Sequence, residues 1–293
     1  MKLSKARRRF QLASALAVNA YWPAWLKGTI YQGKIKGVCL PVLNCYSCPS
    51  AVGACPIGAL QNFFAGLQFN FSIARYQAGL YVLGVLGIFG GLLGRLPCGW
   101  LCPFGLIQDL LYKVPSPKLP IPRVLTYVRH LILIILVAAL PLLAMDEFGM
   151  GKTWFCAWVC PAGTLEAGLP LVALNAGIRE QVGFMFGWKV GILVLFLVWM
   201  TASERAFCRT SCPLGLILGF FNRASLFRMA VDPDKCAECD ACDRICPVRI
   251  KVREAPNSQE CIRCLRCVDA CPSGAVDWAF RPGRRTPVRS ETG

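Results

Sequence analysis

Eight cysteines near the C-terminus form two copies of one spacing pattern, and a proline follows the last cysteine of each copy. The copies are Cys236-x2-Cys239-x2-Cys242-x3-Cys246 and Cys261-x2-Cys264-x2-Cys267-x3-Cys271. This spacing is typical of bacterial proteins with two [4Fe–4S] clusters, in which each run gives three thiolates to one cluster and its fourth cysteine to the other. It predicts one cluster on Cys236, Cys239, Cys242 and Cys271, and a second on Cys246, Cys261, Cys264 and Cys267.

Zinc is the alternative interpretation, because four-cysteine zinc sites also use C-x2-C pairs. Two interlocked runs, each with a proline after its last cysteine, favour iron–sulfur clusters. Such clusters move single electrons. The segment is therefore predicted to be a bacterial-type two-cluster ferredoxin domain (α+β) of a redox protein.

The rest of the chain has the composition of a membrane protein. Of its 293 residues, 55% are hydrophobic and 16% are charged, whereas a soluble domain carries about 25% charged residues. Apolar stretches of nearly the length that crosses a bilayer occur at 10–26, 78–96, 128–145 and 186–202. We therefore expect a mainly α fold: a four-helix polytopic membrane domain (1–224), the ferredoxin domain (225–280) as a polar appendage, and a basic disordered tail (281–293).

The basic residues indicate an orientation. They gather at the N-terminus, between the second and third stretches, and in the C-terminal region. The positive-inside rule then places both termini and the ferredoxin domain in the cytoplasm, with the chain in the cell inner (cytoplasmic) membrane. The net charge of +16 follows from this distribution, so the predicted partner is membrane lipid and not nucleic acid.

Ten further cysteines belong to an internal repeat. Four begin a Cys-Pro-x-Gly tetrapeptide, and three of these have a second cysteine four residues earlier. The tetrapeptides begin at Cys55, Cys102, Cys160 and Cys212, the earlier partners are Cys98, Cys156 and Cys208, and Cys39, Cys45 and Cys48 precede the first copy. Proline suits the first turn of a helix, where free N–H groups and the helix dipole favour an anionic cluster.

In the expected topology the copies alternate between the two membrane faces. Cys98, Cys102, Cys208 and Cys212 fall on the inner face and match a third [4Fe–4S] cluster. Six cysteines fall on the outer face, and the preferred set for a fourth cluster is Cys48, Cys55, Cys156 and Cys160, by analogy with the inner site. For Cys39 and Cys45, an inert buried thiol is an equally good interpretation.

The layout resembles the NapH/NosR/CcoG group of membrane ferredoxins. The resemblance rests on Cys98-x3-Cys102-Pro103, Cys208-x3-Cys212-Pro213 and the double C-terminal run, and covers roughly 78–278. It implies a polytopic subunit that relays electrons between a ferredoxin-type cytoplasmic partner and the membrane, with quinone and other redox subunits as partners. The alternative is an assembly factor that supplies electrons to another metalloenzyme. The segment 39–60 and the pair Cys156/Cys160 are additions to the simplest pattern of the group.

Overall fold

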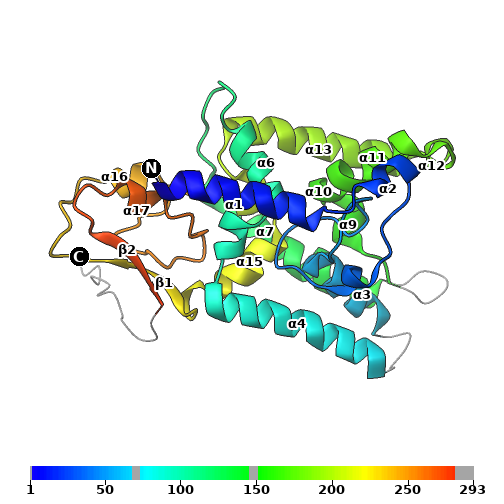
Figure 1. The fold of residues 1–293 in the computed structure, drawn as a ribbon, viewed down its shortest axis with the longest axis horizontal. Coiled ribbons are helices and arrows are strands. Elements are labelled where there is room, and N and C mark those ends of the chain that lie inside the picture. Colours follow the sequence, from blue (N-terminus) through cyan, green and yellow to red (C-terminus); the bar gives the residue numbers. More distant parts are fainter. Residues whose placement is uncertain (1, 68–72, 145–150, 281–293) are drawn as a thin grey trace.

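The computed structural model describes residues 2–67, 73–144 and 151–280, and this part of the chain is mainly helical, as predicted (Figure 1). The N-terminal part contains α1 (Lys2–Val18), α2 (Pro23–Lys27), η1 (Lys34–Gly37), α3 (Pro56–Gly66), α4 (Ile73–Leu93), α5 (Leu96–Trp100), α6 (Pro103–Leu111), α7 (Arg123–Leu131), η2 (Ile132–Ala139) and α8 (Leu140–Leu143). Next come α9 (Trp154–Trp158), α10 (Pro161–Gly163), η3 (Thr164–Gly168), α11 (Leu169–Leu174), α12 (Ala176–Glu180), α13 (Phe184–Ala202), α14 (Ala206–Thr210), α15 (Pro213–Phe220) and η4 (Phe221–Arg223). The cysteine-rich segment adds β1 (Phe227–Val231), α16 (Ala241–Arg244), α17 (Arg266–Ala270) and β2 (Val276–Phe280).

Two helices are long and apolar enough to cross a membrane in the described part of the chain. Helices α7, η2 and α8 form one rod, Arg123–Leu143, and α13 is the other. Only 22% and 17% of their apolar windows are buried inside the protein, whereas the core helix of a soluble protein is mostly buried. They correspond to the predicted spans 128–145 and 186–202, although residues 145–150 lie outside the described part. The apolar stretch of α4, Gln77–Leu93, is shorter, so the four-helix arrangement stays a prediction.

The predicted first span, 10–26, is not one helix. Helix α1 ends at Val18, and the side chain of Asn19 donates to Ala15 O (3.1 Å) and to Asn44 Oδ1 (3.1 Å). The chain then turns, and Pro23 opens α2. Helix α1 therefore begins within the basic N-terminal residues and is 17 residues long.

The cysteine-rich segment is closed by a pair of antiparallel strands. Strands β1 and β2 pair from Phe227↔Phe280 to Val231↔Val276, and the Phe227 ring stacks on Trp278 at a centroid distance of 5.5 Å. All eight cysteines of the double run lie between these strands in the sequence. The predicted tail, 281–293, lies outside the described residues.

This segment packs tightly on the helical part and is not a loosely attached appendage. The Arg263 side chain is fully buried, and it donates to Leu93 O and Asn222 O, both at 2.8 Å. At the N-terminus of α1, the backbone N–H groups of Leu3 and Ser4 donate to the Asp269 carboxylate. Both contacts join the cysteine-rich segment to the helical part of the chain. They therefore hold the segment in one orientation.

Candidate iron–sulfur sites

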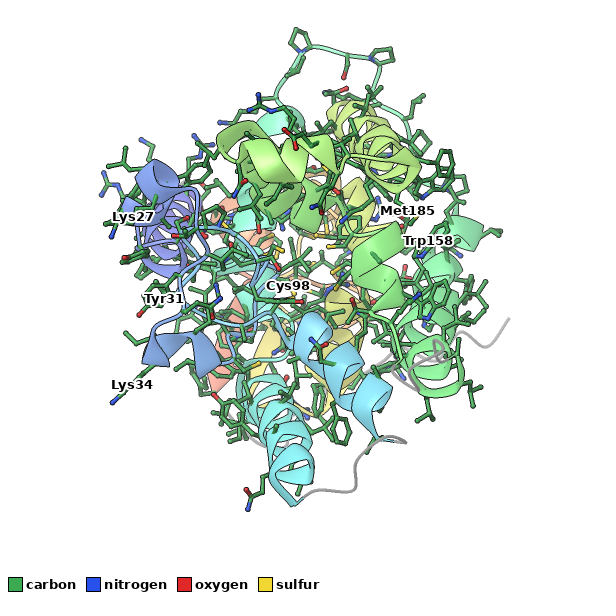
Figure 2. All side chains as sticks on the ribbon, turned by 90° about the vertical axis from the view of Figure 1, so that its right-hand side faces the viewer. Lys27, Tyr31, Lys34, Cys98, Trp158 and Met185 are labelled. Carbon is green, nitrogen blue, oxygen red and sulfur yellow. The ribbon has the colours of Figure 1, made fainter. Side chains whose placement is uncertain are left out.

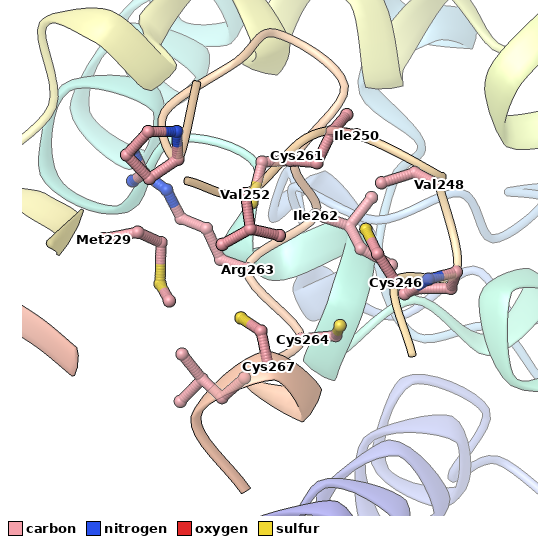
Figure 3. A pocket seen from close by; sticks show the side chains of 13 residues that line it. Met229, Cys246, Val248, Ile250, Val252, Cys261, Ile262, Arg263, Cys264 and Cys267 are labelled. Atoms are coloured by element: carbon pink, nitrogen blue, oxygen red, sulfur yellow. The ribbon is translucent and has the colours of Figure 1, made fainter. Parts of the chain in front are cut away.

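Four cysteines of the double run surround one cavity. Cys246, Cys261, Cys264 and Cys267 line it together with apolar residues such as Met229, Val248 and Ile262 (Figure 3). Burial first, and then the neighbouring thiols, raises the pKa of Cys261 to about 12. These are the four cysteines that the spacing assigns to one cluster, so the donor set and the cavity fit a [4Fe–4S] group.

The other predicted set is more open to solvent. Cys242 is buried in the hydrophobic cluster that also includes Leu265 and Val276, and Cys271 packs against that cluster. Cys236 is half-buried and Cys239 is exposed. The set with Cys236 and Cys239, which we call the surface set, therefore lies nearer the surface of the segment. The set around the cavity, which includes Cys264, lies deeper.

The backbone repeats between the two runs, which are 25 residues apart. Three pairs of residues 25 positions apart adopt the left-handed conformation: Glu238 and Arg263 (φ 50° and 50°), Asp240 and Leu265 (φ 55° and 59°), and Arg249 and Gly274 (φ 52° and 65°). A left-handed residue other than glycine costs about 1 kcal/mol. Changes between right- and left-handed residues form concave nests of N–H groups that bind anions, including iron–sulfur sites. The repeated nests fit two anionic clusters.

The C-x3-C pairs of the helical part also share one local structure. Cys98, Cys156 and Cys208 are each the third residue of a five-residue helix, α5, α9 and α14. The backbone N–H of the following cysteine closes each helix with a bond of 3.0 Å to a carbonyl five residues earlier. The pairs are therefore rigid, and each presents both sulfurs from one turn.

The Cys-Pro-x-Gly tetrapeptides start helices, as the proline predicts. Cys55, Cys102, Cys160 and Cys212 are the N-cap residues of α3, α6, α10 and α15, with extended backbones and proline in the first turn. In the last copy, the backbone N–H of Gly215 donates to the sulfur of Cys212 (3.4 Å). The Cys212 sulfur thus takes the position of a capping oxygen, and all four cysteines lie at a helix N-terminus, where the helix favours negative charge.

Two of the pairs come together beside the cysteine-rich segment. Cys98, Cys102, Cys208 and Cys212, which we call the near quartet, are each at most 6% exposed. Burial is the main reason that the pKa of Cys98 rises to about 11, and the neighbouring Cys208 thiol adds to this rise. Gln108 Nε2 donates to Cys208 Sγ at 2.9 Å. Viewed from the end opposite the cysteine-rich segment, Cys98 lies at the centre of the helices (Figure 2).

Two fully buried arginines flank the near quartet. Arg95 Nη2 donates to Cys208 O (2.7 Å), and Arg205 Nη1 donates to Cys98 O (3.0 Å). Arg205 also forms two bonds of 2.7 Å with Asp109, so the pKa of Asp109 is lowered although its burial acts in the opposite direction. Positive charge at this place compensates an anionic cluster with four thiolates.

A second group of thiols lies farther from the cysteine-rich segment. Cys45, Cys55, Cys156 and Cys160 form this far quartet: after burial, their mutual proximity raises the pKa of Cys160. The Cys45 sulfur lies 3.7 Å from where a Cβ on Gly163 would be, beside the start of α10.

The remaining two cysteines are close to the far quartet but have other polar partners: the N–H of Cys48 donates to Cys45 O (3.0 Å), and after burial the Cys55 thiol adds to the raised pKa of Cys39. Cys48 Sγ is 3.4 Å from Ser50 Oγ. Cys39 forms a β-bridge with Ala54, and its N–H donates to the Tyr81 hydroxyl. The far quartet therefore differs from the set preferred in the sequence analysis by one cysteine: it contains Cys45 in place of Cys48.

Three side chains that the sequence analysis did not single out hold the quartets in place. Gln61 Nε2 donates to Cys156 Sγ (3.1 Å), as Gln108 does to Cys208, and the Glu166 carboxylate accepts the N–H of Cys45 (2.6 Å). Each lies six residues after the cysteine of a Cys-Pro-x-Gly copy. The signal was present in the sequence as Cys-Pro-x-Gly-x-x-Gln, which occurs at both Cys55 and Cys102.

Among the described residues, no three His, Cys, Asp or Glu side chains are close enough to hold a single metal ion. A tetrahedral zinc site, with Zn–S bonds of about 2.3 Å, requires closer sulfurs than a cluster does, because four irons and four sulfides separate the thiolates of a cluster.

Comparisons with known proteins agree with this chemistry. A family model described as a 4Fe-4S binding domain matches residues 53–74, 77–122, 129–169 and 184–231, more than half of the chain. A model described as a 4Fe-4S dicluster domain matches residues 221–278. No solved structure matches the chain.

Several curated proteins are similar over most of the chain. An uncharacterized protein of Methanocaldococcus jannaschii, MJ0749, is 30% identical over 64% of this chain and 65% of its own length, so the match spans slightly less than two thirds of that relative. The ferredoxin-type protein NapH of Haemophilus influenzae is 31% identical over 67% of each chain. The methylamine utilization ferredoxin-type protein MauN of Methylorubrum extorquens is 30% identical over 75% of this chain and 70% of its own. The resemblance predicted from the cysteine motifs is confirmed: the chain carries 4Fe-4S binding domains and belongs to the NapH-like family of ferredoxin-type proteins.

Proposed function

We propose that this protein is a membrane-anchored electron-transfer subunit that relays electrons between a cytoplasmic redox partner and the membrane, through the two ferredoxin clusters and a third cluster on the near quartet. The observation that carries the proposal is the contact between the near quartet and the cysteine-rich segment. Gly99, next to Cys98, touches Ile262 and Cys264, and Trp100 Nε1 donates to Arg263 O (3.0 Å).

This contact sets the order of the sites. Cys264 lines the deeper ferredoxin cavity, and its Cα would lie 3.7 Å from a Cβ on Gly99. The surface set with Cys236 and Cys239 is left to meet a soluble partner. A bound [4Fe–4S] cluster stores and releases one electron. In the proposed relay, an electron passes from the surface set through the deeper set to the near quartet.

The anchoring in the membrane is supported by apolar side chains that the described part of the chain leaves largely exposed. On the rod 123–143, Leu131, Ile134 and Leu143 are 58–69% exposed, and on α13 Leu195 and Val198 are 59% and 65% exposed. Large apolar faces of this kind are unfavourable in water and typical of lipid contact.

Quinone is the membrane partner that we propose, and His130 is a candidate residue for its site. The His130 Nδ1 atom is buried and has no hydrogen-bond partner in the described part of the chain. Its ring centroid is 5.8 Å from that of Tyr127 and 6.4 Å from that of Phe220, and the neighbouring Arg129 pairs with Glu260 of the cysteine-rich segment. An aromatic surround with a buried ring nitrogen suits a quinone carbonyl.

The proposal is tested by removing one sulfur of the near quartet. In the purified full chain, Cys102→Ser should lose about four irons and keep the signals of the ferredoxin pair. Electrons supplied to the ferredoxin clusters by a soluble donor should then no longer reduce a quinone analogue in liposomes. Cys48→Ser, another buried cysteine, is the matched control. Unchanged quinone reduction in Cys102→Ser would contradict the relay.

The buried arginines should set the potential of the third cluster. A unit charge about 6 Å away, at an effective dielectric constant of about 20, changes a one-electron potential by on the order of 100 mV. We therefore expect Arg95→Gln to lower the midpoint potential of this centre by that amount in an anaerobic redox titration. The same change at the exposed Arg9 should leave the potential unchanged, and equal potentials in both variants would argue against the assignment.

A further inference from the structure

We propose that Cys45, Cys55, Cys156 and Cys160 hold a fourth [4Fe–4S] cluster, placed directly after the near quartet, so that the path extends to the opposite end of the helical part. The use of this site for electron relay rests on the function proposed above, but its existence does not. The argument comes from a repeat of side-chain contacts between the two quartets.

The far quartet is built in the same way as the near quartet. In the near quartet, the capping cysteine of α6 faces a C-x3-C pair, and Gln108 of the same helix donates to the first sulfur of that pair. In the far quartet, the capping cysteine of α3 faces the pair Cys156/Cys160, and Gln61 donates to Cys156 Sγ. The glutamine carbonyl oxygens have similar roles, because each accepts a backbone N–H from the pair's short helix: from Phe155, the residue before the first cysteine, in the far quartet, and from the first cysteine, Cys208, in the near quartet.

The fourth ligand is where the two sites differ. In the near quartet it is Cys98 of the short helix α5, whereas in the far quartet it is Cys45, from the irregular loop before α3. Glu166 fixes this loop by accepting the N–H of Cys45 at 2.6 Å. Cys48, three residues later, lies against Ser50. The geometry therefore selects Cys45 over Cys48.

One peptide group connects the two quartets. Cys102 Sγ donates to the carbonyl oxygen of Leu43 (3.9 Å). Burial raises the pKa of Cys55, and the backbone N–H of Asn44, which belongs to the same peptide unit as that carbonyl, is near enough to oppose this rise. Asn44 is 3% exposed and is fixed by a reciprocal amide pair with Asn19 (3.1 and 3.2 Å). Standard peptide and hydrogen-bond dimensions then place the two sulfurs within about 10 Å of each other.

The two sites differ in charge. Two buried arginines flank the near quartet, whereas the buried acidic group bonded to the far quartet is the Glu166 carboxyl, which supplies no positive charge. Positive charge favours the reduced, more negative state of a cluster, and a carboxyl group does not. The fourth cluster should therefore have a lower potential than the third, and the near quartet should be reduced first.

The test compares single cysteine variants of the full chain, purified anaerobically in detergent. Cys45→Ser and Cys160→Ser should each lose about four irons and four sulfides per chain, and the double variant should lose no more than either. Cys48→Ser should keep the iron content of the parent. Loss of iron from Cys48→Ser but not from Cys45→Ser, or a disulfide among the four cysteines of the parent, would overturn the proposal.

A second pair of variants keeps every cysteine and so avoids loss of the fold. Gln61→Leu should retain full iron and shift the potential and the electron paramagnetic resonance signal of one centre, and Gln108→Leu should shift those of another. If both variants altered the same centre, or neither altered any, the far site would be rejected, while the Cys102→Ser result for the near site would still stand.

Discussion

Replacing Arg205 by methionine should destabilise the folded protein by about 3 kcal/mol. Arg205 is fully buried and forms two bonds of 2.7 Å with Asp109, whose other partners include Arg7 at 3.1 Å and Gln11 at 3.5 Å. Removing one partner of a buried ion pair leaves a charge that is only partly compensated, which costs about 3–5 kcal/mol. We place the effect at the low end because Arg7 remains. The measurement is thermal unfolding in detergent, followed by tryptophan fluorescence.

Two controls separate this effect from a general loss of basic residues. Arg9→Met, on the exposed side of α1, should change the unfolding free energy by less than about 0.5 kcal/mol. The double variant Arg205→Met with Asp109→Asn should recover part of the loss, because the unpaired carboxylate is gone. A double variant that is as unstable as the sum of the singles would mean that the pair is not coupled.

The second large effect is expected from Gly99→Val. A Cβ on Gly99 would collide with the carbonyl oxygen of Ile262, which is backbone and cannot swing aside. The collision should push the cysteine-rich segment away from the near quartet at a cost of about 2–3 kcal/mol. Electron transfer from the ferredoxin clusters to the near quartet should slow, although iron content stays at the parent level. Rapid-mixing reduction, followed optically, measures the rate.

The matched control is Gly87→Val on α4. Nothing lies within 4 Å of a Cβ on Gly87, so the same substitution should leave both the rate and the iron content unchanged. A normal rate in Gly99→Val would show that this contact is not on the electron path.

The cysteine spacing was sufficient to predict much of the site, because ligands on one short run are constrained by local geometry. The set around Cys264 and the helix starts at Cys55 and Cys102 follow from sequence spacing and from proline chemistry. The choice between Cys45 and Cys48 did not follow, since the loop that carries them has no regular period and its register depends on the distant Glu166.

The helix boundaries show a similar limit of the sequence. The apolar composition of 10–26 indicated a span, but the chain breaks at Asn19, whose amide side chain pairs with Asn44. Asn44 lies in the loop that joins the two quartets. Hydropathy averages over a window and cannot detect such a pairing, because it depends on a residue 25 positions away.

The buried Arg263 side chain also implies an order of biosynthesis. Its two acceptors, Leu93 O and Asn222 O, belong to residues that leave the ribosome before it does. Cys261 and Cys264 flank this arginine, so their loop has its final anchor only after the helices have assembled. Iron and sulfide delivery to the deeper cavity should therefore be the last step of maturation. A fragment that contains the cysteine-rich segment without the helices would lack the surface on which this step is completed.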